Sequence, residues 1–529
     1  MSTRITPKIE MDFGSGWVDV SADVVSAVTA SWGIHGSSPK QRVADPGTLR
    51  FRLDNSAQNS GGLVGYYAPG HPNVRSGFDI RTPVRYVLSH DFFGDRVKWV
   101  GTVASVRVSA GLAQTADVSC SDWLEDAARS RLTSVAVQTD VQSDDLFQTV
   151  VASAAKQPPG GTIVGTGSDI YAYALDDVQD EKTTLLEVIQ RLMLSEFGIC
   201  HESAGVLHFE GRKARAGGGS VKFALDEDRQ IVSLVLESGR DDIINRVQVI
   251  VHPRRRDAAA TTVLFNLGSA VEIPRGTSIT INCPYRDPNQ QAQRVGGVDM
   301  VSPVANTDYT FTANKDGTGA DYTSQLSVSY VGTPGGNSAT VIATNAGPAD
   351  GWIPANGLQL RGRGLYNFEP VIADYGDNDS INAFGEGVLG YDMPFQSSTA
   401  NANDLALFLL ALNKDPKPRA QKVTFVANWS EDELQQAFNL EISDRVSITS
   451  PTAGLDAEPY FINGFTFVSH PSGLTTVTLD LAPVNTASYW QLEVPGHTEL
   501  DETTVLGYGL FSVGWILDTS SLGSTTFLN

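Results

Sequence analysis

His201, Glu202 and His208 have the residue types and spacing best suited to metal chemistry, because they flank a predicted two-residue turn at Ala204-Gly205. Such a turn joins two antiparallel strands and would place His201 opposite His208, near enough to share an ion. The alternative is a pair of half-exposed histidines on a polar strand face. No further ligand is evident nearby in the sequence. Both interpretations stay open, and we predict no metal site from this pattern.

An acidic cluster later in the chain fails the pattern of a calcium loop. Asp374, Asp377 and Asp379 resemble such a loop at first sight. An EF-hand needs an oxygen ligand and a glycine where this chain has Ile381 and Asn382. An acidic turn is the simpler interpretation.

Two arginine-containing stretches have the composition of phosphate-binding motifs. Arg254-Arg255-Arg256 could contact nucleic acid, but a three-residue run in a chain of net charge −22 favours a solvated strand end. Arg361-Gly362-Arg363-Gly364 lacks the third glycine of a dinucleotide fingerprint. Neither stretch predicts a nucleotide or nucleic-acid site.

No nucleophile or cofactor motif is recognisable. The sequence has no P-loop, HExxH or GxSxG motif. Cys120, Cys200 and Cys283 cannot form a disulfide framework or a CxxC-type zinc site, and the first two lie in apolar strand contexts typical of packed thiols. We assign the tryptophans at positions 17, 32, 99 and 123 to the core. The sequence therefore predicts a non-enzyme, with no catalytic residue, cofactor or metal ion.

Composition and charge narrow the class of protein. The chain has 529 residues, which indicates several domains, and its 38 basic and 60 acidic residues give a net charge of −22. This excess opposes electrostatic binding of nucleic acid. Residues 1–140 hold 14 basic and 14 acidic side chains (net zero), whereas residues 401–529 hold 5 and 15 (net −10). Met1–Phe13 lacks the apolar core of a secretory signal, and Leu405–Leu412 is too short to span a bilayer. We expect synthesis in the host cytoplasm and no membrane anchor.

The elements that would position these residues are mostly strands. Alternation of apolar and polar residues at 49–54 and 84–88, and a β-branched run at 100–108, predict an antiparallel barrel or sandwich in the first 120 residues. Helices follow, one capped by Ser121, one over 144–156 capped by Ser143, and one opened by a Thr184/Glu187 capping box. Val206–Glu210 is predicted as the return strand of the His201 hairpin.

The second half of the chain combines an insertion with further strands. Ile243–His252 is a predicted strand, and residues 257–399 are poor in charge and rich in Gly, Thr, Asn and Ser, which favours an all-β insertion. Asn403 is predicted to cap a helix through Leu412, and Ser430 a short helix over Glu431–Phe438. Strands are predicted at 445–449, 460–469 and 475–481.

Several segments, taken in order, resemble the tail hub proteins of long-tailed bacteriophages, also called baseplate hub or tail-tip minor tail proteins. The resemblance covers roughly half of the chain, mainly residues 1–130 and 400–529. Its motifs are Gly16-Trp17-Val18-Asp19-Val20-Ser21, Gly47-Thr48-Leu49-Arg50-Phe51-Arg52-Leu53-Asp54-Asn55, Trp99-Val100-Gly101-Thr102-Val103 before Asp122-Trp123-Leu124, Asp241–Val249, Glu441–Val446, Tyr460–Gly464, Thr475–Leu479 and Trp515–Gly523.

The resemblance implies a mainly β fold with α+β parts, built from two tail-tube-like β-barrels, an inserted α+β unit and an all-β insertion. Asp241–Val249 would open the second barrel, and helix Asn403–Leu412 would cover its sheet. The expected domains are a first barrel at 1–130, an α+β domain at 131–220, a discontinuous second barrel at 221–257 plus 400–490, the all-β insertion at 258–399 and a C-terminal extension at 491–529.

The same resemblance implies a structural virion protein at the tail tip, a homotrimeric hub that continues the tail tube as a pseudo-hexameric ring. The implied partners are further copies of the chain, tail tube or distal tail ring proteins, and other tail-tip proteins, including the tape measure. DNA would pass through the lumen without specific binding. The alternatives are a distal ring or receptor-binding minor tail protein, a tail-associated cell-wall hydrolase, and a secreted carbohydrate-binding β protein, which the missing signal opposes.

Overall fold

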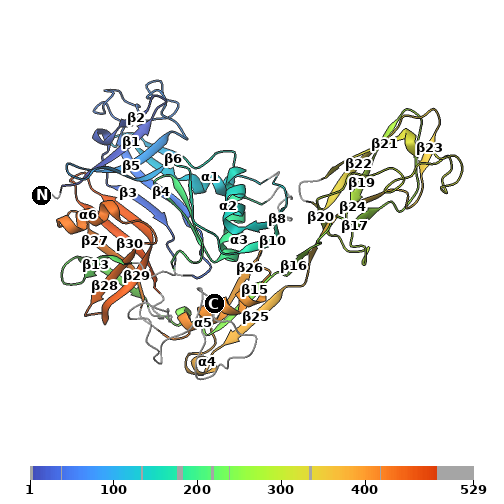
Figure 1. Cartoon of the computed structure of the whole chain (residues 1–529). Coiled ribbons are helices and arrows are strands. Elements are labelled where there is room, and N and C mark those ends of the chain that lie inside the picture. The colour runs from blue at the N-terminus through green and yellow to red at the C-terminus, as the bar shows by residue number, and fades with distance from the viewer. Residues whose placement is uncertain are drawn as a thin grey trace.

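The protein is represented by a computed structural model that describes residues 4–36, 38–132, 135–175, 183–215, 220–237, 239–332, 336–416 and 419–484. The fold is mainly β, with many strands in several sheets and a few short helices among the described residues, as the sequence predicts. A large body carries an arm that projects to one side (Figure 1). The predicted C-terminal extension at 491–529 and the Trp515–Gly523 motif lie outside the described residues.

The body is organised around one sheet of 13 strands, and its first half comes from the N-terminal region. The alternation at Leu49, Phe51 and Leu53 buries these side chains and leaves Arg50 and Arg52 exposed, as predicted. The strand order in this half is β3-β4-β7-β6-β5-β1-β2. Its strands are β1 (Thr6–Asp12), β2 (Trp17–Asp19), β3 (Val28–Gly33), β4 (Asp45–Asp54), β5 (Pro83–His90), β6 (Gly94–Ser109) and β7 (Thr115–Ser121).

The second half of the same sheet comes mainly from the C-terminal region. Its strand order is β14-β27-β30-β29, with β28 on β29 and β13 on β28. The short helix α6 (Glu431–Asn439) starts after Ser430, as predicted, and buries Leu434 and Phe438 in the core that both halves share, with Phe438 beside Phe93 of the first half. The strands are β13 (Val221–Asp226), β14 (Ile231–Glu237), β27 (Arg419–Val426), β28 (Arg445–Ser450), β29 (Leu455–Ser469) and β30 (Thr475–Pro483).

A small α+β unit packs beside the sheet. The Thr184/Glu187 capping box is present, but two other predicted caps are wrong. Asp122, not Ser121, caps the first helix, and Ser143 lies inside the second helix, where its hydroxyl donates to Glu196. The elements are α1 (Trp123–Arg129), β8 (Gln138–Gln142), α2 (Ser143–Ala152), β9 (Thr162–Val164), β10 (Ile170–Ala174), α3 (Leu185–Glu196), β11 (Ile199–Ser203) and β12 (Val206–Glu210).

A separate three-stranded sheet corrects the predicted second barrel. β15 (Arg246–Val251) pairs with β25 (Val371–Gly376) and β26 (Val388–Met393), and not with the large sheet. Helix α5 (Thr399–Asn413), capped by Ser398 and not by Asn403, covers this small sheet instead of a barrel. The physical reason is that Leu405 and Leu409 bury their side chains against Val247 and Val249. Helix α4 (Asn378–Phe384) lies between β25 and β26.

The arm begins at β16, so the predicted insertion boundary at residues 257 and 258 is also corrected. Its buried side chains, including Phe311, Val341 and Leu360, form a core of their own. The predicted insertion reached residue 399, whereas β25, α4 and β26 belong to the body. The arm strands are β16 (Arg254–Arg256), β17 (Thr262–Asn266), β18 (Val271–Ile273), β19 (Ser278–Pro284), β20 (Gly296–Val298), β21 (Leu326–Gly332), β22 (Ser338–Asn345), β23 (Gly351–Ile353) and β24 (Gln359–Asn367).

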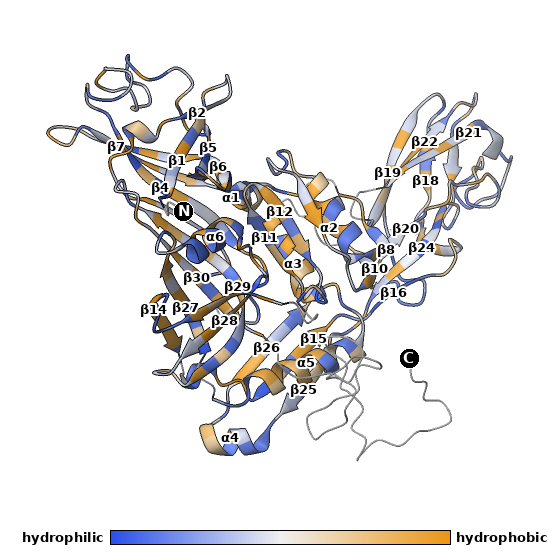
Figure 2. Ribbon diagram, turned by 60° about the vertical axis from the view of Figure 1, so that its left-hand side comes forward, coloured by the Kyte–Doolittle hydropathy of each residue, from blue (hydrophilic) through white to orange (hydrophobic). Residues whose placement is uncertain are grey.

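Buried hydrophobic side chains form four groups, which correspond to the large sheet, the α+β unit, the arm and the small sheet with α5. Hydrophobic residues run along the strands of the body and along α3 and α5 (Figure 2). Within the described part of the chain, no helix is both long enough and apolar enough to cross a bilayer.

Candidate functional site

The feature that organises the body is the junction at which β29 pairs with β3 and makes one sheet of the two halves. The antiparallel register runs from Gly464 opposite Gly33 to Ser469 opposite Val28. Gly33 has φ +103°, and a Cβ at this position would lie 2.5 Å from the Asn463 carbonyl oxygen and from the Gly464 Cα. Only glycine therefore fits where the two backbones come together.

Aromatic stacking fills the interior side of this junction. The Trp32 ring lies 5.3 Å from the Phe465 ring and 5.4 Å from the Phe467 ring, and both pairs are stacked. All three side chains are buried. Large aromatic pairs of this kind add about 0.5–1.5 kcal/mol beyond the area they bury, so the junction is a rigid connection.

Polar side chains tie the other side of the junction. His35 Nδ1 lies 2.7 Å from Asp480 Oδ2, and the Lys422 ammonium lies 3.0 Å from the second Asp480 oxygen. The Ser31 and Thr466 hydroxyls are 3.0 Å apart across the paired strands. Asp480 is buried, so the Lys422 ammonium offsets its charge, while the His35 ring contacts its other oxygen. The two halves are thus held by both apolar and polar contacts.

The β11–β12 hairpin of the α+β unit reaches both halves of the sheet. Ser203 donates to Glu441 Oε2 over 3.0 Å, and Arg96 of the first half donates to Glu441 Oε1 over 2.9 Å. Lys98 is buried and donates to the Phe438 and Leu440 carbonyls. Burial lowers the pKa of Lys98 to about 8. The hairpin therefore fixes the α+β unit where the halves meet.

The hairpin places His201 opposite His208, as predicted from the Ala204-Gly205 turn. The two rings stack 4.7 Å apart and nearly parallel, and His201 Nε2 lies 3.3 Å from Glu210 Oε1. Burial, and then the charge of His201, lower the pKa of His208 to about 4. The lone pair of each imidazole nitrogen lies in the plane of its ring. In a parallel stack these lone pairs therefore do not converge on one ion.

Glu202 does not join the two histidines, because successive side chains of a strand point to opposite faces. Its Oε2 accepts the Trp123 N–H over 3.0 Å, and no group of three His, Cys, Asp or Glu in the described residues could hold a metal ion. The carboxyl group of Asp122 accepts the Gly47 and Leu124 N–H groups. Burial raises the pKa of Asp122 to about 8, and burial followed by the charge of Asp122 raises the pKa of Glu202. Burial therefore disfavours charge on this neighbouring pair of carboxyl groups.

In the acidic cluster of Asp374, Asp377 and Asp379, carboxylates pair with basic side chains and cap a helix. Asp374 accepts two hydrogen bonds from the Arg246 guanidinium, which lower the pKa of Asp374 to about 2. Asp377 caps α4 and pairs with Lys414 over 2.8 Å, and Asp379 lies in the first turn of that helix. The expected acidic turn is thus a helix start.

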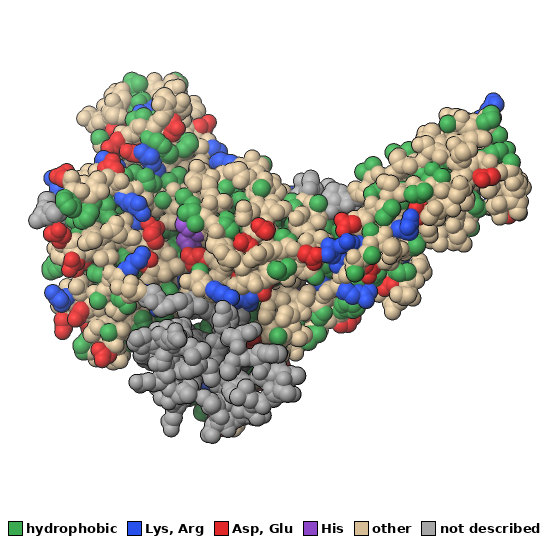
Figure 3. Space-filling view, viewed as in Figure 1, with side chains coloured by type: hydrophobic (Ala, Val, Ile, Leu, Met, Phe, Trp, Pro, Cys, Tyr) green, Lys and Arg blue, Asp and Glu red, His purple; other side chains and the backbone are tan. Residues whose placement is uncertain are grey.

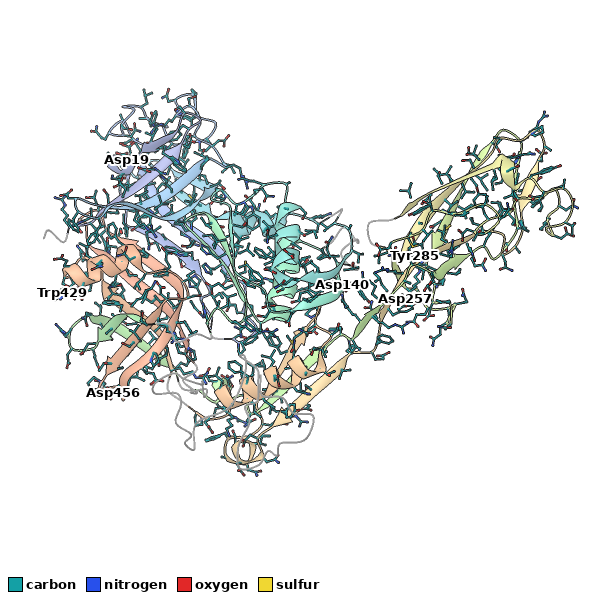
Figure 4. The ribbon with its side chains drawn as sticks, in the orientation of Figure 1. Asp19, Asp140, Asp257, Tyr285, Trp429 and Asp456 are labelled. Atoms are coloured by element: carbon teal, nitrogen blue, oxygen red, sulfur yellow. The ribbon has the colours of Figure 1, made fainter. Side chains whose placement is uncertain are left out.

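The arginine run has a different role from the solvated strand end that was predicted. Arg254 donates to the Tyr173 and Pro394 carbonyls, Arg255 lies over the Tyr366 ring, and Arg256 pairs with Asp140. The contacts of Arg254 and Arg256 join the arm to the body, whereas Arg255 and Tyr366 both belong to the arm; Asp140 lies on the body and Asp257 at the arm base (Figure 4). On the face shown in Figure 3, charged side chains gather at this joint. Arg361 and Arg363 lie within strand β24, where no phosphate-binding loop is formed.

The cysteines are free and buried in β7, β11 and β19, as expected for packed thiols. Burial raises the pKa of Cys283 to about 12, and burial also raises the pKa values of Cys120 and Cys200. Trp32, Trp99 and Trp123 are buried as predicted. Trp17 is not, since it is 39% exposed under the Arg85 guanidinium.

The residues that sequence reasoning missed are Gly33, Lys98 and Asp480. Gly33 follows Trp32 at the end of a strand, and that position is the one available signal of a close backbone approach. The sequence around Lys98 and Asp480 contains no pattern that predicts their roles, because the groups they contact are distant in the sequence. The assembled site can hold two sheet halves and a third unit rigidly together.

No family model matches the sequence. No curated protein shows significant similarity to it either. Among solved structures, the chain is similar to the 43 kDa tail protein of prophage MuSo2 from Shewanella oneidensis, with 10% identity, a TM-score of 0.46, and coverage of 90% of this chain and 98% of that one.

Two further solved structures show a similar level of likeness. A tail protein from Neisseria meningitidis MC58 has 10% identity and a TM-score of 0.46, covering 90% of this chain and 96% of that one. Prophage tail protein gp18 from Listeria monocytogenes EGD-e has 10% identity and a TM-score of 0.39, covering 90% and 94%. These similarities assign neither a family nor a function to this chain.

Proposed function

We propose that this chain is a structural protein of a phage tail tip, a trimeric hub without catalytic activity that continues the tail tube. The observation that carries the proposal is the β29–β3 junction, which places two β halves side by side in one sheet. In the proposed assembly each half is a tube-like barrel. Three copies then supply six halves, which matches a six-fold tube.

The ends of the large sheet support closure into a ring. The sheet branches at β29, and strands β14, β13 and β2 are its terminal strands, so each has a free edge within the described sheet. Val232 and Val235 on β14 are exposed. A free strand edge is a template for pairing with another chain. Edge-to-edge pairing between copies would extend the sheet around a ring.

The charge of the chain suits a passage for DNA. Three copies carry −66, three times the −22 of one chain. A lumen of that sign repels phosphates, so DNA would slide without specific binding. The proposed partners are tail tube or distal ring proteins on one side, other tail-tip proteins on the other, and the tape measure within the channel.

The test is the number of copies in the assembly. We expect native mass spectrometry of the purified chain to give a trimer, and electron microscopy to show a ring. Val232→Lys places a charge on the β14 edge and should weaken the trimer. Val331→Lys is the matched control, because Val331 on the arm and Val232 are both 63% exposed. A strictly monomeric protein, or one absent from virions, would contradict the proposal, and six copies would indicate a distal ring protein.

A further inference from the structure

A row of hydroxyl side chains crosses eight consecutive strands of the large sheet. The strands, in order, are β14, β27, β30, β29, β3, β4, β7 and β6, so the row passes through the junction from one half into the other. Residues directly opposite each other in neighbouring strands project from the same face. The registers of these strands place in one row Ser233, Thr424, Thr478, Thr466, Ser31, Thr48, Ser121 and Thr102.

The row lies on the face of the sheet that points away from the hydrophobic core. Seven of its side chains are half-buried and Ser233 is exposed, whereas neighbours along the strands, such as Leu49 and Val477, are buried in the core. Helix α6 buries Leu434 and Phe438 in that core, so it lies on the opposite side of the sheet. The row is therefore on the side of the sheet that α6 does not cover.

The two halves contribute equally to the row. Each supplies four consecutive strands and four hydroxyl side chains, with the β29–β3 junction in the middle. In direct contacts within the row, the Thr424 and Thr478 hydroxyls are 2.8 Å apart, and the Ser31 and Thr466 hydroxyls 3.0 Å apart. The equal contributions are those expected if the halves occupy equivalent positions around one axis.

The set of eight strands has an open edge at each end. Strand β14 pairs with β27 on one side and with no described strand on the other. In β6, residues 94–102 pair with β5 and residues 102–109 with β7, so residues 104–109 are open on the side away from β7. Val235 on β14 and Val108 on β6 are both exposed. Open strand edges are templates for pairing with another chain.

We infer that β14 of one copy pairs with residues 104–109 of β6 in the next copy, and that the face with the hydroxyl row lines the enclosed channel. This inference rests on the proposed trimeric ring. Three copies of eight strands give 24 (three times eight), and a strand spacing of about 4.8 Å gives a circumference of roughly 115 Å. Barrels of about 16–18 strands already enclose an aqueous channel.

The chemistry of the row suits a wall past which DNA moves. Neutral hydroxyl groups form weaker hydrogen bonds with phosphates than cationic side chains do. On the rows beside it, Asp480 contacts Lys422 and Arg52 contacts Asp117, while Arg50 is exposed. The net charge of the ring supplies repulsion at long range, and the hydroxyl row supplies a neutral surface at contact.

Photo-crosslinking tests the pairing of the two edges. A benzophenone side chain replaces Val108 on β6, and in the control it replaces the exposed Val331 on the arm. Isotope-labelled and unlabelled full chains are mixed, so that links between copies are recognised. We expect mass spectrometry to map links from position 108, and not from 331, to residues 231–237 of another copy. An unchanged melting temperature verifies that both variants are folded.

Native mass spectrometry of the same samples separates the two ways in which the inference can fail. A monomer would overturn the proposed function and this inference together. A trimer without links from position 108 to residues 231–237 would overturn this inference alone, because the copies would then meet at other surfaces.

Distances between nitroxide labels test which face lines the channel. Thr478→Cys places a label in the row, and Gln435→Cys places one on the exposed surface of α6, on the opposite side of the sheet. The native cysteines are buried, so the label attaches to the introduced residue. We expect the distance between copies to be roughly 15–20 Å shorter at position 478, since packed layers lie about 10 Å apart. A shorter distance at position 435 would overturn the inferred orientation.

Discussion

The protein has two junctions of opposite character, one within its body and one between the body and the arm. At the first, β29 and β3 pair over their length and bury Trp32 between two phenylalanines. At the second, the chain passes through β16 and β24, and the contacts are those of Arg254 with the Tyr173 and Pro394 carbonyls and of Arg256 with the exposed Asp140. The first junction has a buried aromatic stack flanked by polar contacts, whereas the second consists mainly of arginine contacts.

The difference indicates that the two halves of the large sheet unfold together, while the arm unfolds separately. Buried apolar contacts couple elements cooperatively, whereas exposed ion pairs contribute little. The arm also has its own core and a bidentate Arg361–Asp308 pair at 2.6 and 2.8 Å. We therefore expect a rigid body that carries an arm with its own stability.

The largest expected effect comes from removing Trp32. Trp32→Ala should destabilise the body by about 3–5 kcal/mol, because a buried aromatic is lost from the junction. Phe311→Ala should cost a similar amount in the arm alone. Hydrogen exchange read by mass spectrometry, peptide by peptide, measures both. If Trp32→Ala loosened the arm equally, the separation of the two units would be wrong.

Gly33→Ala should destabilise the body by about 3 kcal/mol, since it combines a strained positive φ with a backbone clash. Gly390→Ala on β26 is the matched control, because a Cβ there meets nothing within 4 Å. Urea unfolding of both variants gives the free energies of unfolding. Equal values for the two would contradict the close approach at Gly33.

The body should lose stability as pH rises toward 8, while the arm should not. The pKa of Asp122 is raised from its ordinary value near 4 to about 8 in the folded state. At pH values between these two pKa values, folding therefore takes up a proton. The stabilisation that this proton provides is complete at low pH and is lost as pH rises through the folded-state pKa of Asp122. Asp122→Asn, which retains an oxygen for the Gly47 N–H, should flatten the pH profile of unfolding. A slope unaltered by Asp122→Asn would reject this assignment.

The smallest effect is expected at the arm joint. Arg256→Gln removes a partly exposed pair with Asp140, so the free energy of unfolding should change by less than about 1 kcal/mol. Limited proteolysis between arm and body measures whether the joint opens more often. A loss comparable to that of Trp32→Ala would mean that the two junctions are equivalent.

Local sequence patterns alone determined many elements of this protein. The alternation at Leu49, Phe51 and Leu53 predicts β4, the Thr184/Glu187 pair predicts the start of α3, and the Ala204-Gly205 turn predicts the register of His201 with His208. Each signal works because the residues that interact lie within a few positions of one another.

Tertiary structure alone decided which elements pair. Phe465 lies opposite Trp32 although 433 positions separate them in the sequence, and β15 joins a small sheet instead of the large one. An apolar strand or helix has the same periodicity whichever apolar surface it meets. Only the competition among all available surfaces for burial selects the partner, and that competition decided the β29–β3 junction and the packing of α5 on the small sheet.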